Sequence, residues 1–282
     1  MRRVVLFGNP LQRKHSAAMH NAAFEAFGVD AHYELAEVDE EQLRVQVPRA
    51  RDEHWLGFQI TAPHKRAVMP LLDDIEPGAL AIGAVNSVEV TPDGRLIGFN
   101  TDVTGFVAGL TGGLGFEIAG STVVVAGAGG VGHAVVYGIL THGASKVTVL
   151  DLDVRDVERL AAEFDDVGAI EAMAFDDPRA AARLGRADLF VNATSVGMLS
   201  KGPVIPVSQL RGDACVFDVV YIPAETELVR QARAAGMKAM NGGEMLVAQA
   251  AAAFMRWTGL GDPSEVMRAA VLPLLAAETA GP

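Results

Sequence analysis

Three glycines in the middle of the chain have the spacing of a phosphate-binding turn. Gly127, Gly129 and Gly132 follow an apolar run in the pattern G-x-G-x-x-G. The first glycine permits a tight turn, the second lets the backbone approach a pyrophosphate, and the third lets a helix pack closely on a strand. The residues between them complete the predicted turn: Ala128, Gly130 and Val131. Free N–H groups at the start of a following helix would bind the phosphates.

The elements around this turn have the order that such a site requires. Residues 122–126 are β-branched and apolar, which predicts a buried parallel strand, and residues 131–142 predict a helix. A second strand is predicted at 147–150, and Asp151 ends it 24 residues after Gly127. The uncharged stretch 118–145 is long enough to span a bilayer, but its seven glycines argue against a membrane helix. The sequence therefore predicts a dinucleotide site.

The acid at the end of the second strand indicates which dinucleotide binds. A carboxylate at Asp151 accepts hydrogen bonds from the ribose hydroxyls and repels a 2′-phosphate. Sites for NADP place Arg or Lys just after this strand, whereas here Leu152 follows and the first basic residue is Arg155. NAD is therefore predicted, and NADP is the less favoured cofactor.

Composition narrows the class of protein. The chain has 282 residues, of which half are hydrophobic, so it can form one large or two ordinary globular domains. A formal net charge of −12 argues against nucleic acid or a membrane surface as a partner, although a local basic site could still bind a small anion. The single cysteine, Cys215, lies in an apolar run and is predicted to be a core residue. The apolar run near Met1 is too short for a signal peptide, so a cytoplasmic location is predicted.

Hydrophobic patterns predict an α/β protein in which a first α/β unit precedes a doubly wound parallel sheet. In the first unit, strands are predicted at 4–7, 31–38, 56–60, 85–90 and 96–99, and helices at 17–27 (with Ser16 as N-cap), 40–50, 65–72 and 103–110. Residues 77–82 predict a further turn or a short helix. In the second, further strands are predicted at 169–174, 188–192, 216–220 and 238–240, and helices at 154–164, 177–184, 225–235, 242–257 and 262–277. Ligands of such sheets bind at the carboxyl ends of the strands, which here include Gly127, Asp151 and the loop 192–198.

Short motifs along nearly the whole chain resemble the shikimate/quinate dehydrogenase family. The matching stretches are GNP (8–10), SAAMHN (16–21), TAPHK (61–65), GAVN (83–86), GFNTD (98–102), GAGGVG (127–132), VNATSVGM (191–198), DVVYIP (218–223) and MLVAQAAAAF (245–254). The NAD-dependent quinate/shikimate branch is the most similar, because the usual Asn-Arg-Thr of the family is replaced here by Asp151-Leu152-Asp153. The resemblance implies hydride transfer between NAD and the secondary alcohol of a cyclic polyhydroxy acid.

The resemblance also implies a domain order and a catalytic pair. A substrate domain would cover 1–104, a Rossmann domain 105–240, and C-terminal helices at 241–282 would return to the substrate domain. Lys65 matches the family's catalytic lysine and Asp102 its aspartate partner. A lysine whose pKa is lowered in a cleft can take the hydroxyl proton, and an aspartate beside it can orient the lysine. Their spacing of 37 residues does not itself show that they meet.

Further residues receive roles through the same resemblance. Thr61, Asn86 and Gln249 match positions that hydrogen-bond the ring hydroxyls, and Tyr221 matches a tyrosine near the substrate carboxylate. The predicted cofactor contacts outside the glycine turn are Asp151, Leu152, Asn192, Ala193, Thr194, Val219 and Met245. The histidines His15, His20 and His64 are not spaced as metal ligands, and no metal is predicted.

Some positions depart from the family pattern. The carboxylate clamp of the family is usually two serines or threonines separated by one residue and followed by proline. Here Lys14 and Ser16 occupy these positions and Ala17 replaces the proline. Gln59 stands where asparagine is frequent, and Glu244 where glycine is usual. An ammonium at Lys14 could still pair with a substrate carboxylate.

Three functions remain in competition. The first is a dehydrogenase of shikimate or quinate, and the second is the same chemistry on an amino-substituted or differently hydroxylated ring. The third is a dinucleotide-sensing regulator without activity, against which the presence of both Lys65 and Asp102 counts. The predicted assembly is a monomer or a homodimer.

Overall fold

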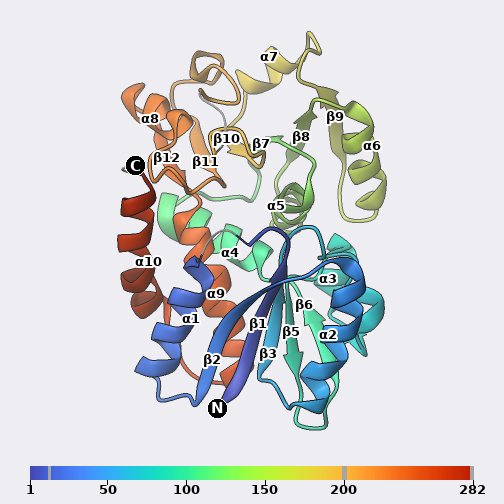
Figure 1. Cartoon of the computed structure of the whole chain (residues 1–282). Helices are drawn as coiled ribbons and strands as arrows, with labels where there is room; N and C mark the ends of the chain where they lie inside the picture. Colours follow the sequence, from blue (N-terminus) through green and yellow to red (C-terminus); the bar gives the residue numbers. More distant parts are fainter. Residues whose placement is uncertain (12–13, 199–201, 280–282) are drawn as a thin grey trace. The chain divides into compact units, whose positions relative to one another are not determined.

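The chain forms two compact units in a computed structural model that describes residues 1–11, 14–198 and 202–279 (Figure 1). The first unit combines Met1–Thr101 with Val247–Leu274, and the second combines Asp102–Leu246 with Leu275–Pro282. Each unit contains a six-stranded sheet. The α/β class predicted from the sequence is confirmed.

The first unit has a mixed sheet with the strand order β2-β1-β3-β5-β6-β4. Strand β1 is parallel to β2 and β3, whereas β5 is antiparallel to β3 and β6. The strands are β1 (Arg2–Gly8), β2 (Ala31–Glu37), β3 (Gly57–Ile60), β4 (Asp74–Ile75), β5 (Ser87–Val90) and β6 (Leu96–Phe99). The helices are α1 (His15–Ala26), α2 (Glu40–Asp52), η1 (Met69–Leu71), α3 (Pro77–Ile82) and parts of α9 (Gly243–Thr258) and α10 (Ser264–Thr279).

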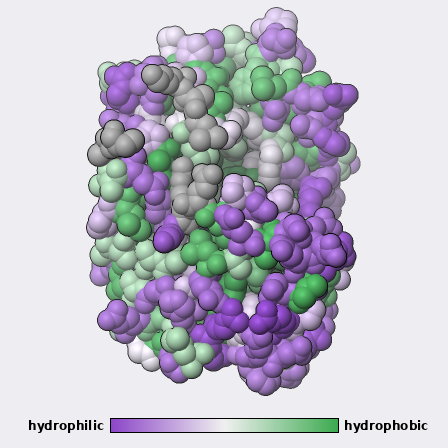
Figure 2. All heavy atoms as spheres, in the orientation of Figure 1, coloured by the Kyte–Doolittle hydropathy of each residue, from purple (hydrophilic) through white to green (hydrophobic). Residues whose placement is uncertain are grey.

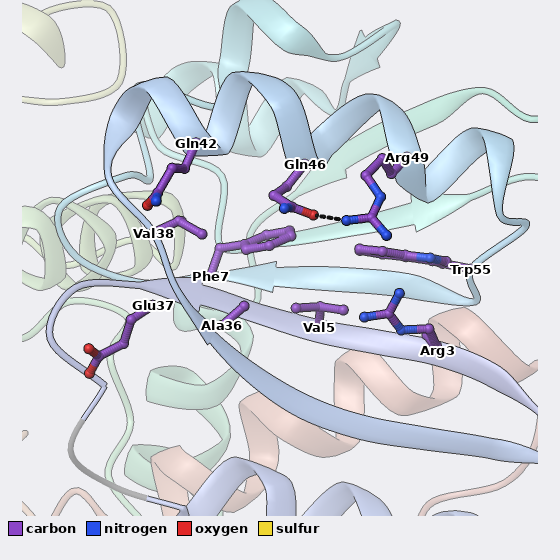
Figure 3. Close-up of a pocket in the computed structure, with 10 residues that line it drawn as sticks. All are labelled: Arg3, Val5, Phe7, Ala36, Glu37, Val38, Gln42, Gln46, Arg49 and Trp55. Atoms are coloured by element: carbon purple, nitrogen blue, oxygen red, sulfur yellow. Dashed lines mark hydrogen bonds between the residues drawn. The ribbon is translucent and has the colours of Figure 1, made fainter.

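Helices cover both faces of this mixed sheet. Figure 3 shows α2 above one face, where Phe7 of β1 packs in one apolar cluster with Leu43 and Val47 of α2. On the other face α1 contacts α9, because the rings of Phe24 and Phe254 lie 5.7 Å apart. Burial of apolar side chains on both faces stabilises the unit.

The C-terminal end of α9 is fixed to the sheet by a tryptophan and an arginine. Trp257 donates its indole N–H to the carbonyl of Val88 at 3.0 Å. A Cβ atom at Gly57 would lie 2.3 Å from the same indole nitrogen, so this position accepts only glycine. Arg256 forms an ion pair with Glu89 at 2.6 Å. Segments far apart in sequence are therefore joined within the first unit.

The second unit has a fully parallel sheet with the strand order β12-β11-β10-β7-β8-β9. Its strands are β7 (Thr122–Ala126), β8 (Lys146–Asp151), β9 (Ile170–Ala174), β10 (Leu189–Asn192), β11 (Cys215–Asp218) and β12 (Lys238–Asn241). Its helices are α4 (Asp102–Ala108), η2 (Gly109–Gly113), α5 (Gly130–Thr141), α6 (Val154–Glu163), α7 (Ala180–Leu184), η3 (Val207–Gln209) and α8 (Glu227–Ala234).

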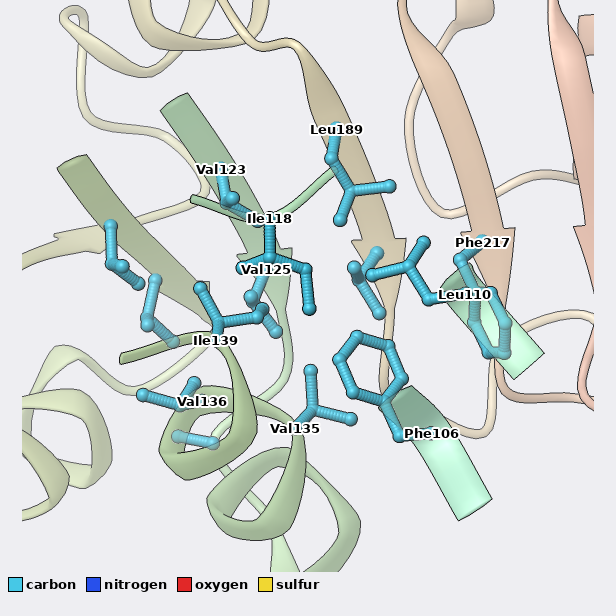
Figure 4. Packing of buried hydrophobic residues seen from close by; sticks show 14 of the residues in the cluster. Phe106, Leu110, Ile118, Val123, Val125, Val135, Val136, Ile139, Leu189 and Phe217 are labelled. Carbon is cyan, nitrogen blue, oxygen red and sulfur yellow. The ribbon is translucent and has the colours of Figure 1, made fainter. Parts of the chain in front are cut away.

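The parallel sheet is buried on both faces, which explains the continuous apolar run of β7. Alternate residues of a strand point to opposite faces. Val123 and Val125 belong to the cluster that also holds Val135 of α5 (Figure 4), whereas Val124 belongs to the cluster that holds Leu228 of α8. Helices thus cover both faces, and the predicted doubly wound sheet is confirmed.

The predicted helix at 65–72 is wrong. Residues 62–68 form successive turns, and only Met69–Leu71 form a short 3₁₀ helix. In an α-helix the carbonyl of Lys65 would accept the N–H of Met69. Here it accepts the N–H of Val85 at 2.9 Å, and the N–H of Met69 donates to the carbonyl of Arg66. A contact with a distant segment therefore replaces the bond that would have continued an α-helix.

Three smaller predictions also need correction. The first long helix begins at His15 with Lys14 at its N-cap position, so Ser16 lies inside α1 and does not cap it. Helix α7 begins at Ala180 and not at residue 177, because Asp177 accepts the N–H of Arg179 with its carboxylate. The predicted helix 103–110 is divided, since α4 ends at Ala108 and a π-helical turn follows.

Hydrophilic and hydrophobic residues intermingle on the face drawn in Figure 2. The most exposed large apolar side chains lie apart in the sequence, at Leu152, Met1, Val45, Leu80 and Leu272. Among the described residues, no helix is both long and apolar enough to cross a membrane. The same residues contain no cluster of three or more His, Cys, Asp or Glu side chains that could hold a metal ion.

Candidate functional site

The carboxyl ends of the parallel strands meet at one edge of the second unit. Ala126 of β7 pairs with Leu150 of β8 and with Asn192 of β10, and Asn192 pairs with Asp218 of β11. The glycine turn, Asp151 and the loop after Asn192 therefore lie along the same edge, as predicted. This is the edge at which parallel α/β sheets bind their ligands.

The glycines of the turn divide into two kinds by what surrounds them. Gly127 has φ +104°, and a Cβ atom there would lie 2.9 Å from the methyl carbon of Thr194. A Cβ atom at Gly132 would lie 2.2 Å from the carbonyl oxygen of Gly127. Gly129 and Gly130 have no heavy atom within 4 Å of such a position and are exposed. Gly127 and Gly132 therefore close the turn, whereas Gly129 and Gly130 leave open space for a ligand.

The start of helix α5 is suited to bind phosphate. The helix begins at Gly130 with Gly129 as its N-cap, and no side chain caps it. The first N–H groups of a helix have no intrahelical acceptor, so here they stay available to an anion. This arrangement fits a dinucleotide pyrophosphate.

An acidic and apolar strand end lies beside the turn. Asp151 accepts the N–H of Ala128 at 2.7 Å and the N–H of Leu152 at 2.6 Å, so its carboxylate joins β8 to the glycine turn. The side chain of Leu152 is 89% exposed. The cation of Arg155 forms an ion pair with Asp153 at 2.6 Å. This corner therefore carries two carboxylates and one exposed apolar side chain, and the guanidinium of Arg155 is held by one of those carboxylates.

The other predicted cofactor residues differ in burial. Ala193 and Thr194 are half-buried and lie against Gly127, and the N–H of Val219 donates to the carbonyl of Asn192 at 2.9 Å. Met245 is 6% exposed and belongs to the apolar core of the second unit. A contact of Met245 with the cofactor stays a prediction.

Several predicted substrate residues of the first unit share one end of its sheet. Thr61 follows β3, and its N–H donates to the carbonyl of Phe7 at 2.8 Å. Asn86 precedes β5, and its carbonyl accepts the N–H of Ile60 at 2.9 Å. Lys65 is half-buried in the turns after Thr61. Thr61, Lys65 and Asn86 therefore come from neighbouring segments of one sheet edge.

The amide of Asn86 is oriented by a residue that the sequence interpretation missed. Its nitrogen donates to the hydroxyl of Thr101 at 3.1 Å, and its oxygen accepts the N–H of Thr101 at 2.9 Å. Both residues are buried. These two bonds fix which end of the amide carries the oxygen and hold the side chain in one orientation. A contact of Asn86 with a substrate stays a prediction.

A second polar group in the first unit surrounds Gln59. Its amide oxygen accepts the hydroxyl of Tyr33 at 2.6 Å, and its nitrogen donates to the hydroxyl of Ser87 at 3.2 Å. Burial raises the pKa of Tyr33, and a hydrogen bond with Ser16 opposes this rise. Ser16 is thus connected to Gln59 through one tyrosine. Gln59 is mainly a partner of protein groups.

The remaining predicted residues lie in four different parts of the chain. Lys14 is exposed at the start of α1, and Gln249 is half-buried on α9. Tyr221 is half-buried in the segment after β11. Asp102 is 4% exposed as the first residue of α4 and belongs to the second unit, whereas Lys65 belongs to the first. The contact between Lys65 and Asp102 stays a prediction.

A cavity of about 270 Å³ opens in the first unit between α2 and the sheet (Figure 3). Its lining includes Trp55 and the cations of Arg3 and Arg49 but none of the predicted site residues. Both arginines form ion pairs with Glu53. The charge of these cations is therefore balanced within the protein, and the cavity offers no unpaired arginine to an anion.

Two segments of the chain match known families. Residues 6–88 match the family described as shikimate dehydrogenase substrate binding domain, and residues 242–272 match the shikimate 5′-dehydrogenase C-terminal domain.

One protein and two solved structures illustrate the range of relatives. Shikimate dehydrogenase (NADP(+)) of Methanopyrus kandleri is 40% identical over 274 residues, which are 95% of this chain and 94% of that protein. Quinate dehydrogenase of Corynebacterium glutamicum in complex with NAD is 36% identical with a TM-score of 0.89, covering 96% of this chain and 99% of the other. The ligand-free 5-ketofructose reductase of a Gluconobacter strain is 32% identical with a TM-score of 0.87, covering 97% and 98%.

Proposed function

Because this chain belongs to the shikimate dehydrogenase family, we propose that it oxidises the secondary alcohol of a cyclic polyhydroxy acid with NAD. Membership of the family makes the protein an oxidoreductase with a nicotinamide dinucleotide cofactor. Shikimate and quinate are the proposed substrates. The single observation that carries the choice of NAD is the strand end formed by Asp151 and Leu152.

The argument for NAD is electrostatic. The carboxylate of Asp151 would face the ribose hydroxyls and accept their hydrogen bonds, but it would repel a 2′-phosphate. Leu152 supplies no compensating charge, and Arg155 is already paired with Asp153 at 2.6 Å. The Corynebacterium glutamicum relative in complex with NAD supports this choice, whereas the Methanopyrus kandleri relative is named for NADP(+).

The proposed chemistry needs one base and one orienting group from this chain. A dinucleotide held by the glycine turn and Asp151 would supply the hydride acceptor for the carbon that bears the alcohol. Lys65 takes the hydroxyl proton as the carbonyl forms, and it returns that proton in the reverse direction. Asp102 orients the lysine and accepts a hydrogen bond from the reacting hydroxyl. Thr61, Asn86, Tyr221 and Gln249 hold the other substrate groups in this proposal.

The clamp for the substrate carboxylate is the part that differs from the family. Lys14 offers an exposed ammonium where a hydroxyl is usual, and a carboxylate can pair with it. Ser16 bonds with Tyr33, so part of its hydrogen-bonding capacity is used within the protein. A second candidate follows from these departures and from the similarity to a 5-ketofructose reductase. It is the same reaction on an amino-substituted ring or on a polyol without a carboxylate.

Steady-state kinetics with shikimate, quinate and a panel of neutral and amino-substituted polyols, each with NAD and NADP, tests the proposal. We expect turnover of a cyclic acid with NAD and a kcat/KM at least about tenfold lower with NADP, because a repelled phosphate loses at least one charged hydrogen bond. Preference for a polyol without a carboxylate would favour the second candidate. Tight binding of NAD without turnover of any compound would favour the regulator.

A matched variant tests the role of the strand end. Leu152→Arg adds a cation beside the ribose position and should raise kcat/KM for NADP by about tenfold or more, since a charged hydrogen bond contributes roughly 1.5–3 kcal/mol. The control Leu152→Gln fills similar space without charge and should change NADP use much less. An unchanged cofactor preference in Leu152→Arg would contradict the assignment. The cytoplasmic location and the assembly as a monomer or homodimer stay predictions.

A further inference from the structure

A buried carboxylate lies at the end of β11 in the second unit. Asp218 is 0% exposed and accepts three hydrogen bonds. One oxygen accepts the amide of Asn192 at 2.9 Å and the N–H of Val220 at 3.1 Å, and the other accepts the hydroxyl of Thr226 at 2.6 Å. Among the described residues, no basic side chain forms an ion pair with Asp218. A charge held only by dipolar donors in the interior requires all of them.

The first of these donors shapes the loop after β10. The amide nitrogen of Asn192 also donates to the carbonyl of Val196 at 3.0 Å. Its amide oxygen accepts the N–H and the hydroxyl of Thr194 at 3.1 and 2.7 Å. One side chain therefore holds both sides of this loop. Because Asp218 accepts the amide nitrogen, it fixes the direction in which Asn192 points.

The same loop forms a wall of the glycine turn. The N–H of Ala193 donates to the carbonyl of Ala126 at 2.7 Å. A Cβ atom at Gly127 would lie 2.9 Å from the methyl carbon of Thr194 and 3.0 Å from the carbonyl of Ala193. At this distance the loop cannot shift without changing the space around the turn.

The third donor ties the network to a helix. Thr226 is the N-cap of α8, and its hydroxyl oxygen accepts the N–H of Val229 at 3.3 Å. The hydroxyl therefore has its hydrogen left for Asp218. Thr226 is 0% exposed, so water does not replace either bond.

We propose that Asp218 is a positioning residue for the dinucleotide, acting through Asn192 and the loop 193–198 on the glycine turn. Asp218 lies one residue before Val219 and does not need to touch the cofactor itself. When Asp218 loses a hydrogen-bond donor, its carboxylate no longer fixes the amide of Asn192. The loop 193–198 can then shift against Gly127, and as a consequence the dinucleotide binds less tightly. The inference rests on the proposed dinucleotide site but not on the identity of the substrate.

Two substitutions at the N-cap of α8 test the proposal. Thr226→Val keeps the shape of the side chain and removes the hydrogen that Asp218 accepts, whereas Thr226→Ser retains it. We expect the Kd for NAD, measured by calorimetry on the full chain, to rise about tenfold in Thr226→Val and to stay near that of the wild type in Thr226→Ser. The KM for the alcohol substrate should change much less than the KM for NAD.

Thr148→Val is the matched control for lost stability. Thr148 is 0% exposed in β8 of the same sheet, and its hydroxyl donates to Glu171 at 3.3 Å, within a strand pair that does not include the loop. Thr148→Val should lower the unfolding temperature and leave the Kd for NAD unchanged. If Thr226→Val lowers the unfolding temperature with no change in that Kd, the network is only structural and the proposal is wrong.

Asp218→Asn provides a second measurement if Thr226→Val does not fold. This variant keeps the volume of the side chain but places an N–H group against hydrogen-bond donors, so it too should weaken NAD binding. Unchanged NAD binding would overturn the proposal. Binding of NAD is measured without turnover. A wild-type protein that binds NAD but oxidises no substrate would therefore contradict the proposed function and leave this test intact.

Discussion

Lys65 is the side chain on which the proposed proton transfer depends. Replacing Lys65 by Ala should lower kcat by at least about 100-fold, because a positioned general base contributes 10²–10⁴-fold to the rate. NAD binding should be unaffected, since the glycine turn belongs to the other unit. Stopped-flow measurement of turnover together with calorimetry of NAD binding separates the two effects.

The neighbouring cation provides the control for Lys65. Arg66 is exposed, and Arg66→Ala removes an equal charge one residue away. This variant should retain most of the activity. If Lys65→Ala turns over as fast as Arg66→Ala, Lys65 is not the base.

Some residues that orient other polar side chains were not identified from the sequence. Thr101 and Tyr33 were not predicted to belong to any site, although they orient Asn86 and Gln59. Asp218 stood within a recognised motif but received no role. The sequence feature that points to a role for Asp218 is a lone acid at the end of an apolar strand. A carboxylate in such a place is buried and needs hydrogen-bond donors from the protein.

At the scale of elements, the packing of α5 on β7 depends on a glycine in its first turn. Gly132→Ala would bring a methyl group to 2.2 Å from the carbonyl oxygen of Gly127, so the helix must move away from the strand. We expect a loss of about 1–3 kcal/mol in the free energy of unfolding, as for other overpacked positions. Chemical denaturation without nucleotide measures it.

Gly130→Ala is the matched substitution in the same helix. No heavy atom lies within 4 Å of the added methyl group, so this variant should unfold at the same denaturant concentration or at a slightly higher one. Equal stability of the two alanine variants would show that the tight contact at Gly132 does not limit the packing.

Elements were predicted well where the pattern was long and local. Residues 154–164 were predicted as a helix and α6 spans Val154–Glu163, and the hairpin strand 96–99 is β6 as predicted. Strand β4 was missed because its two residues carry no periodicity and it exists only through pairing with β6.

At the scale of the whole molecule, a buried histidine should make the first unit sensitive to acid. His20 is 0% exposed, stacks on Tyr33 at 4.6 Å, and its ring nitrogens have no hydrogen-bond partner among the described residues. Burial lowers the pKa of His20 to about 3, and the nearby Gln59 opposes this shift. The folded protein therefore binds fewer protons than the unfolded chain between about pH 3 and the ordinary pKa of 6.5. Stability is fully present above this window and falls as the pH falls through it.

His20→Leu removes this proton linkage. Between pH 7.5 and 5.0 the wild type should lose about 2 kcal/mol more stability than the variant, since one pKa unit corresponds to about 1.4 kcal/mol. Both tryptophans, Trp55 and Trp257, lie in the first unit, so fluorescence-detected denaturation reports on the unit that holds His20. The exposed His32 supplies the control, and His32→Leu should keep the wild-type dependence on pH. If the free energy of unfolding depends on pH in the same way in the wild type and in His20→Leu, the proton linkage is not due to His20.

Local spacing in the sequence is enough to predict the parallel sheet, the glycine turn and the acid beside that turn. A strand, a turn and a helix that follow one another must bring Gly127, Gly129 and Gly132 to one end of a strand, and Asp151 ends the next strand. The family resemblance added Lys65 and Asp102 by motif.

The pairing of the buried polar side chains, in contrast, depends on the three-dimensional fold. The bonds of Asp218 to Thr226, of Asn86 to Thr101 and of Gln59 to Tyr33 join segments that no periodicity relates. The same holds for the turns around Lys65, where a bond from Val85 replaced a helical one. A buried polar group without a partner is costly, so most such groups are paired, and the fold decides which partner is within reach.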